Sequence, residues 1–88
     1  MTEQTAAVDL GARVRQLIAD ELGHDVAIVQ DTHGLAADLQ ADSLDMLELV
    51  MAIEEAFGMD IPDADIHEHF TTVGAVVAYV TTRVSDRT

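Results

Sequence analysis

The chain has 88 residues, enough for one small domain, and 49% of them are apolar, which is sufficient for a packed core. Seventeen acidic residues face four arginines, and the net charge of −13 argues against nucleic acid as a partner, because phosphates need cationic neutralisation. The lack of cysteine excludes disulfides, thiolate metal sites and a thiol nucleophile. No apolar run is long enough to span a membrane, and the start Met1-Thr2-Glu3-Gln4 lacks the basic residues of a signal peptide, so we expect a cytoplasmic protein with no membrane insertion. We also expect the protein to be a monomer.

The first predicted element is a helix from about Leu10 to Leu22, preceded by a flexible N-terminal tail over residues 1–8. Asp9 can cap the start of this helix, and Gly23 can end it in a left-handed conformation. Apolar side chains recur on one face at helical spacing: Leu10, Val14, Leu17, Ile18 and Leu22.

Residues 24–42 are predicted to form a long connection to the second helix. Loops of this length are uncommon in compact domains unless they are pinned or functional. We expect five apolar side chains to hold the loop on the helices: Val26, Ile28, Val29, Leu35 and Leu39.

A second helix is predicted from Ser43 to Phe57, because this run contains neither Gly nor Pro, and Gly58 ends it. Asp42 and Ser43 are both suitable N-cap residues, so Ser43 should lie exposed where the loop becomes the helix. The expected core residues of this helix are Leu47, Val50, Ile53, Ala56 and Phe57. Leu44 and Met51 fall nearer to an acidic stripe of Asp45, Glu48 and Glu55 and should stay partly exposed.

Pro62 sets the approach to a short third helix, capped by Asp63 and ending near Glu68. Thr72 caps a last helix from Val73 to about Val84, whose inner side is lined by valines. The predicted fold is therefore all-α, a four-helix bundle with a short third helix and a long loop between helices one and two. Residues 9–84 form the domain, and residues 85–88 form a C-terminal tail.

His67 and His69 are two residues apart, so on a helix they point in different directions and cannot readily share a metal ion. We expect both at the surface and assign no metal site.

Five segments between Leu35 and Val80 match one family in order and spacing: Ala41–Asp45, Glu48–Met51, Ile53–Phe57, Ile61–Asp63 and Phe70–Val73. In these segments the chain resembles acyl carrier proteins of the bacterial type II kind. Gln40 departs from the pattern, because many members have glycine there, and Leu35 replaces a common phenylalanine.

The resemblance implies that Ser43 carries a 4′-phosphopantetheine arm. A separate phosphopantetheinyl transferase would attach the arm by attack of the serine oxygen on the β-phosphate of coenzyme A. The chain itself would be no enzyme: it would hold acyl intermediates as a thioester and present them to enzymes of fatty-acid synthesis or of a related lipid or polyketide pathway.

The resemblance also implies two binding surfaces. One is a docking face for enzymes with basic surfaces, formed by Asp42, Leu44, Asp45, Glu48, Met51 and Glu55. The other is a cleft for the acyl chain, lined by Leu47, Val50, Ile53, Phe57, Ile61 and Val77. A simpler interpretation of each set is open, namely a solvated acidic face and an ordinary core.

Two other functions stay open from the sequence. The chain can be an acidic adaptor with a carrier-like fold and no arm, in which Ser43 is only an N-cap. It can also be an aminoacyl or peptidyl carrier, although Gln40-Ala41-Asp42 replaces the glycines and histidine that often precede the serine there.

Overall fold

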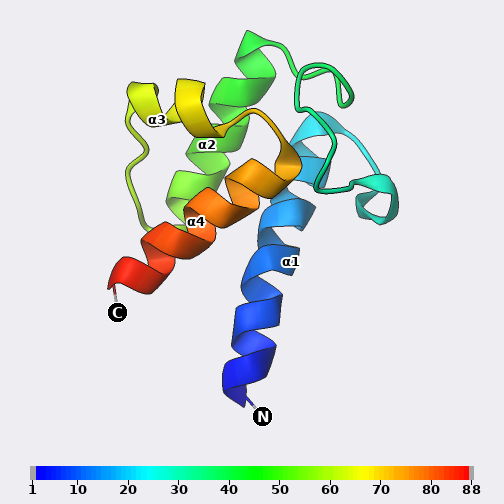
Figure 1. Ribbon diagram of the computed structural model, residues 1–88. Coiled ribbons are helices and arrows are strands. Elements are labelled where there is room, and N and C mark those ends of the chain that lie inside the picture. The colour runs from blue at the N-terminus through cyan, green and yellow to red at the C-terminus, as the bar shows by residue number, and fades with distance from the viewer. Residues whose placement is uncertain (1, 88) are drawn as a thin grey trace.

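The computed structural model describes residues 2–87, with side chains for residues 10–85, and over this range the fold is helical. The elements are α1 (Thr2–Leu22), the 3-10 turn η1 (Val26–Ile28), α2 (Ser43–Phe57), α3 (Asp63–His69) and α4 (Val73–Arg87). α1 packs against both α2 and α4, and α3 contacts α4. Figure 1 shows the short α3 beside the upper part of α2, with both chain ends on the lower side of the view. The predicted four-helix bundle is confirmed.

The first helix is longer than predicted. α1 begins at Thr2 rather than near Leu10, so Asp9 lies within the helix and does not cap its start. The added segment contains neither Gly nor Pro and includes the good helix formers Ala, Glu and Gln, so local propensity favours its helical backbone.

The last helix also continues past its predicted end near Val84, to Arg87. Met1 and Thr88, the outermost residues of the two predicted tails, lie outside the described residues. The flexibility expected of both tails stays a prediction.

Most of the other helix ends follow from local side-chain chemistry. Gly23 and Gly58 follow α1 and α2 with left-handed φ angles of 75° and 62°, as predicted. Thr72 accepts a hydrogen bond at 3.1 Å from the backbone N–H three residues later and so caps α4, also as predicted. The predicted cap of α3 is wrong: Pro62 holds the cap position without a side-chain hydrogen bond, and Asp63 is already helical.

The core is mainly aliphatic, with contributions from α1, the long loop, α2 and α4. Its largest fully buried side chains are Val14, Ile18, Leu35, Leu49, Ile53, Val73, Val76 and Val80. Two aromatic side chains, Phe70 and Tyr79, are also buried.

Some predicted core positions are wrong. Leu47 is 54% exposed and Ala56 is exposed, whereas Leu49 is fully buried. α2 is apolar around much of its circumference, so the sequence pattern does not fix which side faces the bundle. In the loop, Ile28 is 58% exposed, while Val29 is buried as expected.

The long loop is joined to both α1 and α4. Arg15 donates from Nε and Nη2 to the two carboxylate oxygens of Asp31 at 2.8 and 3.0 Å, and these hydrogen bonds lower the pKa of the Asp31 carboxyl group. The Asp31 carbonyl accepts from Gly74 N at 2.9 Å, and the His33 carbonyl accepts from Val73 N at 3.0 Å. A Cβ at position 74 would come within 3.1 Å of the Asp31 carbonyl oxygen, so glycine permits this close approach. The loop therefore has a fixed path towards the start of α2.

Within the described part of the chain, no helix combines the length and the apolar character needed to cross a bilayer.

Candidate functional site

Ser43 is the first residue of α2 and is exposed. The capping is done by its neighbours: Asp42 accepts from Asp45 N at 2.8 Å, and Asp45 accepts from Asp42 N at 3.2 Å. In this reciprocal capping box, each of the two carboxylates accepts a hydrogen bond from a backbone N–H group at the start of the helix. The interpretation of Ser43 as the N-cap is therefore wrong, and its hydroxyl has no capping role.

A tight turn delivers the chain to this position. Gln40 has a φ angle of 62° and is the one non-glycine residue with positive φ in the described part of the chain. The next residue, Ala41, is buried and donates from its backbone N–H to the Leu35 carbonyl at 2.9 Å. His24 adds a second anchor, because its Nε2 lies 2.9 Å from the Leu39 carbonyl oxygen. These contacts fix the loop directly before Ser43.

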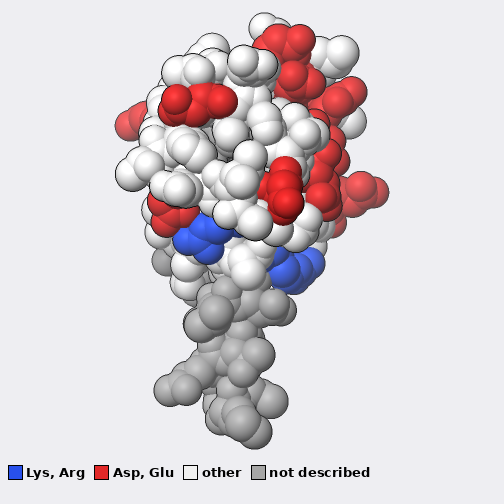
Figure 2. All heavy atoms as spheres, turned by 90° about the vertical axis from the view of Figure 1, so that its right-hand side faces the viewer, with Lys and Arg blue, Asp and Glu red and all other residues white. Residues whose placement is uncertain are grey.

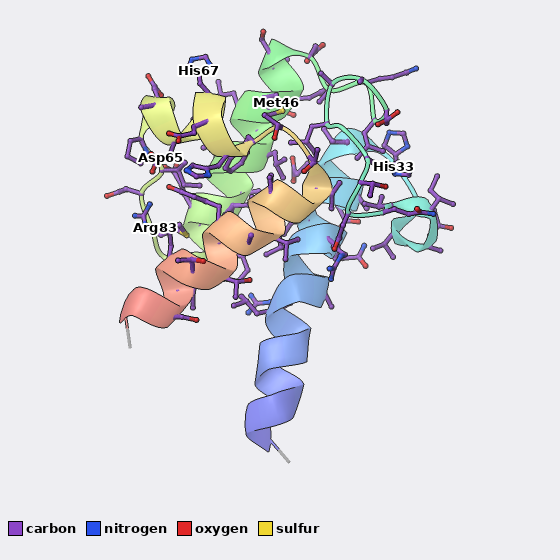
Figure 3. The ribbon with its side chains drawn as sticks, viewed as in Figure 1. His33, Met46, Asp65, His67 and Arg83 are labelled. Atoms are coloured by element: carbon purple, nitrogen blue, oxygen red, sulfur yellow. The ribbon has the colours of Figure 1, made fainter. Side chains whose placement is uncertain are left out.

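A pocket of about 390 Å³ lies between α2 and α3 and includes Ser43 in its wall. The other lining residues are Met46, Leu47 and Val50 from α2, Ile66 and His67 from α3, and Phe70 directly after α3. The α2 residues follow Ser43 at intervals of three, four and seven positions, so they lie on one face of that helix. Met46 projects from the upper part of α2 (Figure 3). The exposed serine thus stands at one end of a largely apolar pocket.

The predicted acyl cleft overlaps this pocket only in part. Leu47 and Val50 line it, whereas Ile53 and Ile61 are buried in the bundle core. Phe57 is half-buried with the Arg13 guanidinium 4.9 Å from its ring centroid.

The last predicted cleft residue, Val77, is half-buried against the core and does not line the pocket. Met46 could have been found from its helical spacing to Ser43. Ile66 and Phe70 were missed because the rotation of a short helix leaves little trace in its sequence.

The second half of α2 borders an open acidic groove of about 760 Å³. Its lining includes three residues predicted for docking, Glu48, Met51 and Glu55, together with Glu21 of α1 and Asp60 of the following loop. Met51 is 57% exposed, as expected. The remaining predicted docking residues lie at the other end of the helix: Asp42, Leu44 and Asp45.

No cation neutralises this groove among the side chains that the structure describes. Arg13 lies over the Phe57 ring and Arg15 binds Asp31, while Arg83 binds groups on the α3 side of the bundle. Figure 2 shows many acidic side chains along the right-hand side of the face in view, whereas basic side chains form two small patches lower on the molecule. The uncompensated negative charge favours partners with basic surfaces.

The side of α3 that faces α4 carries a polar cluster that the sequence analysis missed. The Tyr79 hydroxyl donates to Asp65 at 2.6 Å and accepts from Arg83, which also donates to the Asp60 carbonyl at 3.1 Å. Arg83 and Asp65 pair at 3.5 Å. Burial, reinforced by the hydrogen bond to Asp65, raises the pKa of Tyr79 to about 12. We call these three side chains, Asp65, Tyr79 and Arg83, the α3 clamp.

The two histidines of α3 differ in environment. His67 is exposed on the pocket wall. His69 is half-buried and stacks on Tyr79 with 4.9 Å between ring centroids, so the expectation of a surface position is wrong for this residue. Across the described residues, no group of three or more His, Cys, Asp or Glu side chains is arranged to hold a metal ion.

Fold and site together describe a small helical bundle with an exposed serine on the wall of an apolar pocket. The family model described as the phosphopantetheine attachment site matches residues 12–80, and the chain therefore belongs to this family. Among solved structures, an acyl carrier protein from Enterococcus faecalis is similar over 86% of this chain and 95% of its own, with a TM-score of 0.71 and 30% sequence identity. The fold is that of an acyl carrier protein, and 4′-phosphopantetheine is the covalently bound prosthetic group.

The residues present fit such a group. An arm needs a hydroxyl that solvent and a transferase can reach, and Ser43 is exposed and relieved of capping by Asp42 and Asp45. An attached chain also needs an apolar surface to lie on, and the pocket between α2 and α3 begins at the same serine.

Proposed function

We propose that Ser43 carries the phosphopantetheine arm and that the chain is a type II acyl carrier for fatty-acid synthesis or a related lipid or polyketide pathway. The observation that carries this proposal is the position of Ser43, exposed at the start of α2 and on the wall of an apolar pocket. The arm supplies a terminal thiol, which holds the acyl group as a thioester.

Attachment is a transfer from coenzyme A. The Ser43 oxygen attacks the β-phosphorus, the phosphoanhydride bond breaks, and adenosine 3′,5′-bisphosphate leaves. The serine proton passes to a base that the transferase supplies. The carrier itself therefore needs no histidine beside the hydroxyl. The capping box supports this role because it leaves the serine oxygen available while holding its backbone in place.

The pocket is proposed to shelter the part of the acyl chain nearest to the thioester. Its lining by Met46, Leu47, Val50, Ile66 and Phe70 favours an aliphatic group over a charged aminoacyl group, because a charge there would lose its hydration. The predicted contributions of Ile53, Phe57, Ile61 and Val77 stay a prediction, which requires that the cleft extend into the core.

The acidic groove is proposed as the docking face for the transferase and for acyl-handling enzymes. Glu48, Met51 and Glu55 contribute from its wall, and Asp42, Leu44 and Asp45 extend the face towards Ser43. Exposed pairs of this kind are individually weak, which suits a carrier that must be released after each transfer. The cytoplasmic location and the monomeric state stay predictions.

The test is the intact mass before and after incubation with coenzyme A and a broad-specificity phosphopantetheinyl transferase. We expect the parent to gain the mass of one arm and Ser43→Ala to gain nothing, because the variant lacks the acceptor oxygen. A control carrier shows that the transferase is active. A parent that gains no arm under these conditions would favour the adaptor function, and a Ser43→Ala variant that still gains one would contradict Ser43 as the site.

A further inference from the structure

The pocket beside Ser43 has one basic side chain in its wall. Apart from Ser43, its lining is apolar except for His67, which projects from α3. Figure 3 shows His67 at the edge of α3 that lies towards the start of α2. The imidazole of His67 and the hydroxyl of Ser43 therefore belong to the lining of the same pocket.

His67 also differs from the other three histidines in having no partner within the described part of the chain. His24 contacts the Leu39 carbonyl at 2.9 Å, and the ring of His33 accepts from a backbone N–H at 3.2 Å. His69 stacks on Tyr79. The exposed ring of His67 is thus available to an external ligand.

No arginine competes for this role among the described side chains. Arg13 and Arg15 are engaged by Phe57 and Asp31, and Arg83 is held in the α3 clamp on the opposite side of α3. An anion fixed at Ser43 would otherwise meet the carboxylates of Asp42 and Asp45. The pocket wall therefore offers one described group that can both donate a hydrogen bond and carry positive charge, the imidazole of His67.

We propose that His67 binds the phosphodiester that joins the arm to Ser43, and so holds the base of the arm against α3 at the pocket mouth. This inference rests on the proposed attachment at Ser43. A phosphodiester has two non-bridging oxygens that accept hydrogen bonds and keeps a single negative charge across the neutral range. Imidazole donates from a ring N–H, and once protonated it adds a charge-assisted bond.

The contact is measured by the 31P chemical shift of the attached phosphate between about pH 5 and 8, the range in which histidine changes charge. The phosphodiester does not titrate there, so an inflection of its shift reports a neighbouring group. The charged and titratable groups nearest to His67 along α3 are Asp63, Asp65, Glu68 and His69, and the start of α2 adds the carboxylates of Asp42 and Asp45. Arg83 of α4 lies on the other side of α3, in the α3 clamp. We expect the phosphorus inflection to coincide with that of the His67 ring proton shift.

Variants separate His67 from these neighbours. His67→Gln should abolish the inflection, and His67→Lys should restore a charge without an inflection in this range. His69→Gln is the matched control on the same helix and should keep it. With the arm shown to be attached by intact mass, a flat profile in the parent, or an unchanged inflection in His67→Gln, would overturn the role of His67 alone. Failure of the arm to attach would overturn this inference together with the proposed function.

Discussion

At the scale of single residues, Glu48 is the cleanest probe of the docking face. Asp42 and Asp45 also cap α2, so their substitution would disturb the helix as well as the surface charge. Glu48 lines the acidic groove and has no hydrogen bond or ion pair to another described residue. A change at this position therefore reports on charge with little effect on the fold.

We predict that Glu48→Lys lowers kcat/KM for loading of Ser43 by about tenfold at low salt, equivalent to about 1.4 kcal/mol. Reversal of the charge replaces attraction to a basic transferase surface by repulsion. Circular dichroism should be unchanged. Glu68→Lys is the matched control, an exposed glutamate of α3 outside the groove, and an equal loss in both variants would contradict local docking at Glu48.

Gln40 is strained by its left-handed backbone, with φ at 62°. Side chains with a Cβ lose about 1–2 kcal/mol in this conformation, whereas glycine adopts it freely but loses more entropy on folding. We predict that Gln40→Gly raises the free energy of unfolding by about 1 kcal/mol or less. Chemical denaturation measures the change. Gln40→Ala keeps the strain and should not stabilise the protein, so equal effects of the two variants would contradict this explanation.

The sequence predicts those site residues whose position depends on residues close to them along the chain. Ser43 could be placed at an exposed helix start because short polar side chains cap helices, although Asp42 rather than Ser43 proved to be the cap. The α3 wall of the pocket could not be predicted, because it depends on how two helices face one another. His67 was accordingly expected only at the surface, without its position beside Ser43.

At the scale of elements, helix existence and most C-terminal ends were predictable, but helix rotation was not. Gly23 and Gly58 end α1 and α2 by adopting a left-handed backbone conformation, which depends only on the residue type at that position. The rotation of α2 depends on competition among several apolar faces, and Leu49 is buried where Leu47 was expected. The ion pair between Arg15 and Asp31 spans sixteen positions and has no local signal in the sequence.

The α3 clamp is the element-scale contact that best lends itself to a test. The folded protein raises the pKa of Tyr79 from 10.0 to about 12, so folding favours the neutral phenol. The resulting stabilisation is fully present below the unfolded pKa of 10.0 and is lost as the pH rises towards 12. The chain has no lysine or cysteine and one tyrosine, so few other side chains titrate in this window.

We therefore predict that the parent loses stability between about pH 10 and 12 and that Tyr79→Phe loses much less over the same range. Near neutral pH the variant should be less stable by about 1 kcal/mol, because Asp65 and Arg83 lose the hydroxyl between them. Urea denaturation across the pH range gives both quantities. Parallel pH profiles of parent and variant would exclude Tyr79 as the cause of the alkaline loss.

At the scale of the whole molecule, the net charge of −13 on 88 residues opposes the compact state by self-repulsion. We predict that raising NaCl from about 10 mM to 150 mM increases the Tm by several degrees, because the Debye length falls from about 30 Å to about 8 Å. Mg²⁺ should act at lower concentration. A double variant, Glu48→Gln with Glu55→Gln, removes two charges from the groove and should show a smaller salt effect. A Tm that does not change with salt would contradict a role for self-repulsion.

The attachment of α3 is unequal on its two sides. Towards α4 it is fastened by Asp65 to Tyr79 and Arg83, while towards α2 its residues Ile66 and His67 line the pocket. A displacement of α3 away from α2 would therefore leave its hydrogen bonds to α4 intact. If the pocket holds acyl chains as proposed, longer cargo lifts α3 further. The surface shape of the carrier would then depend on the length of the bound acyl chain, and a partner enzyme could recognise that length without contacting the chain.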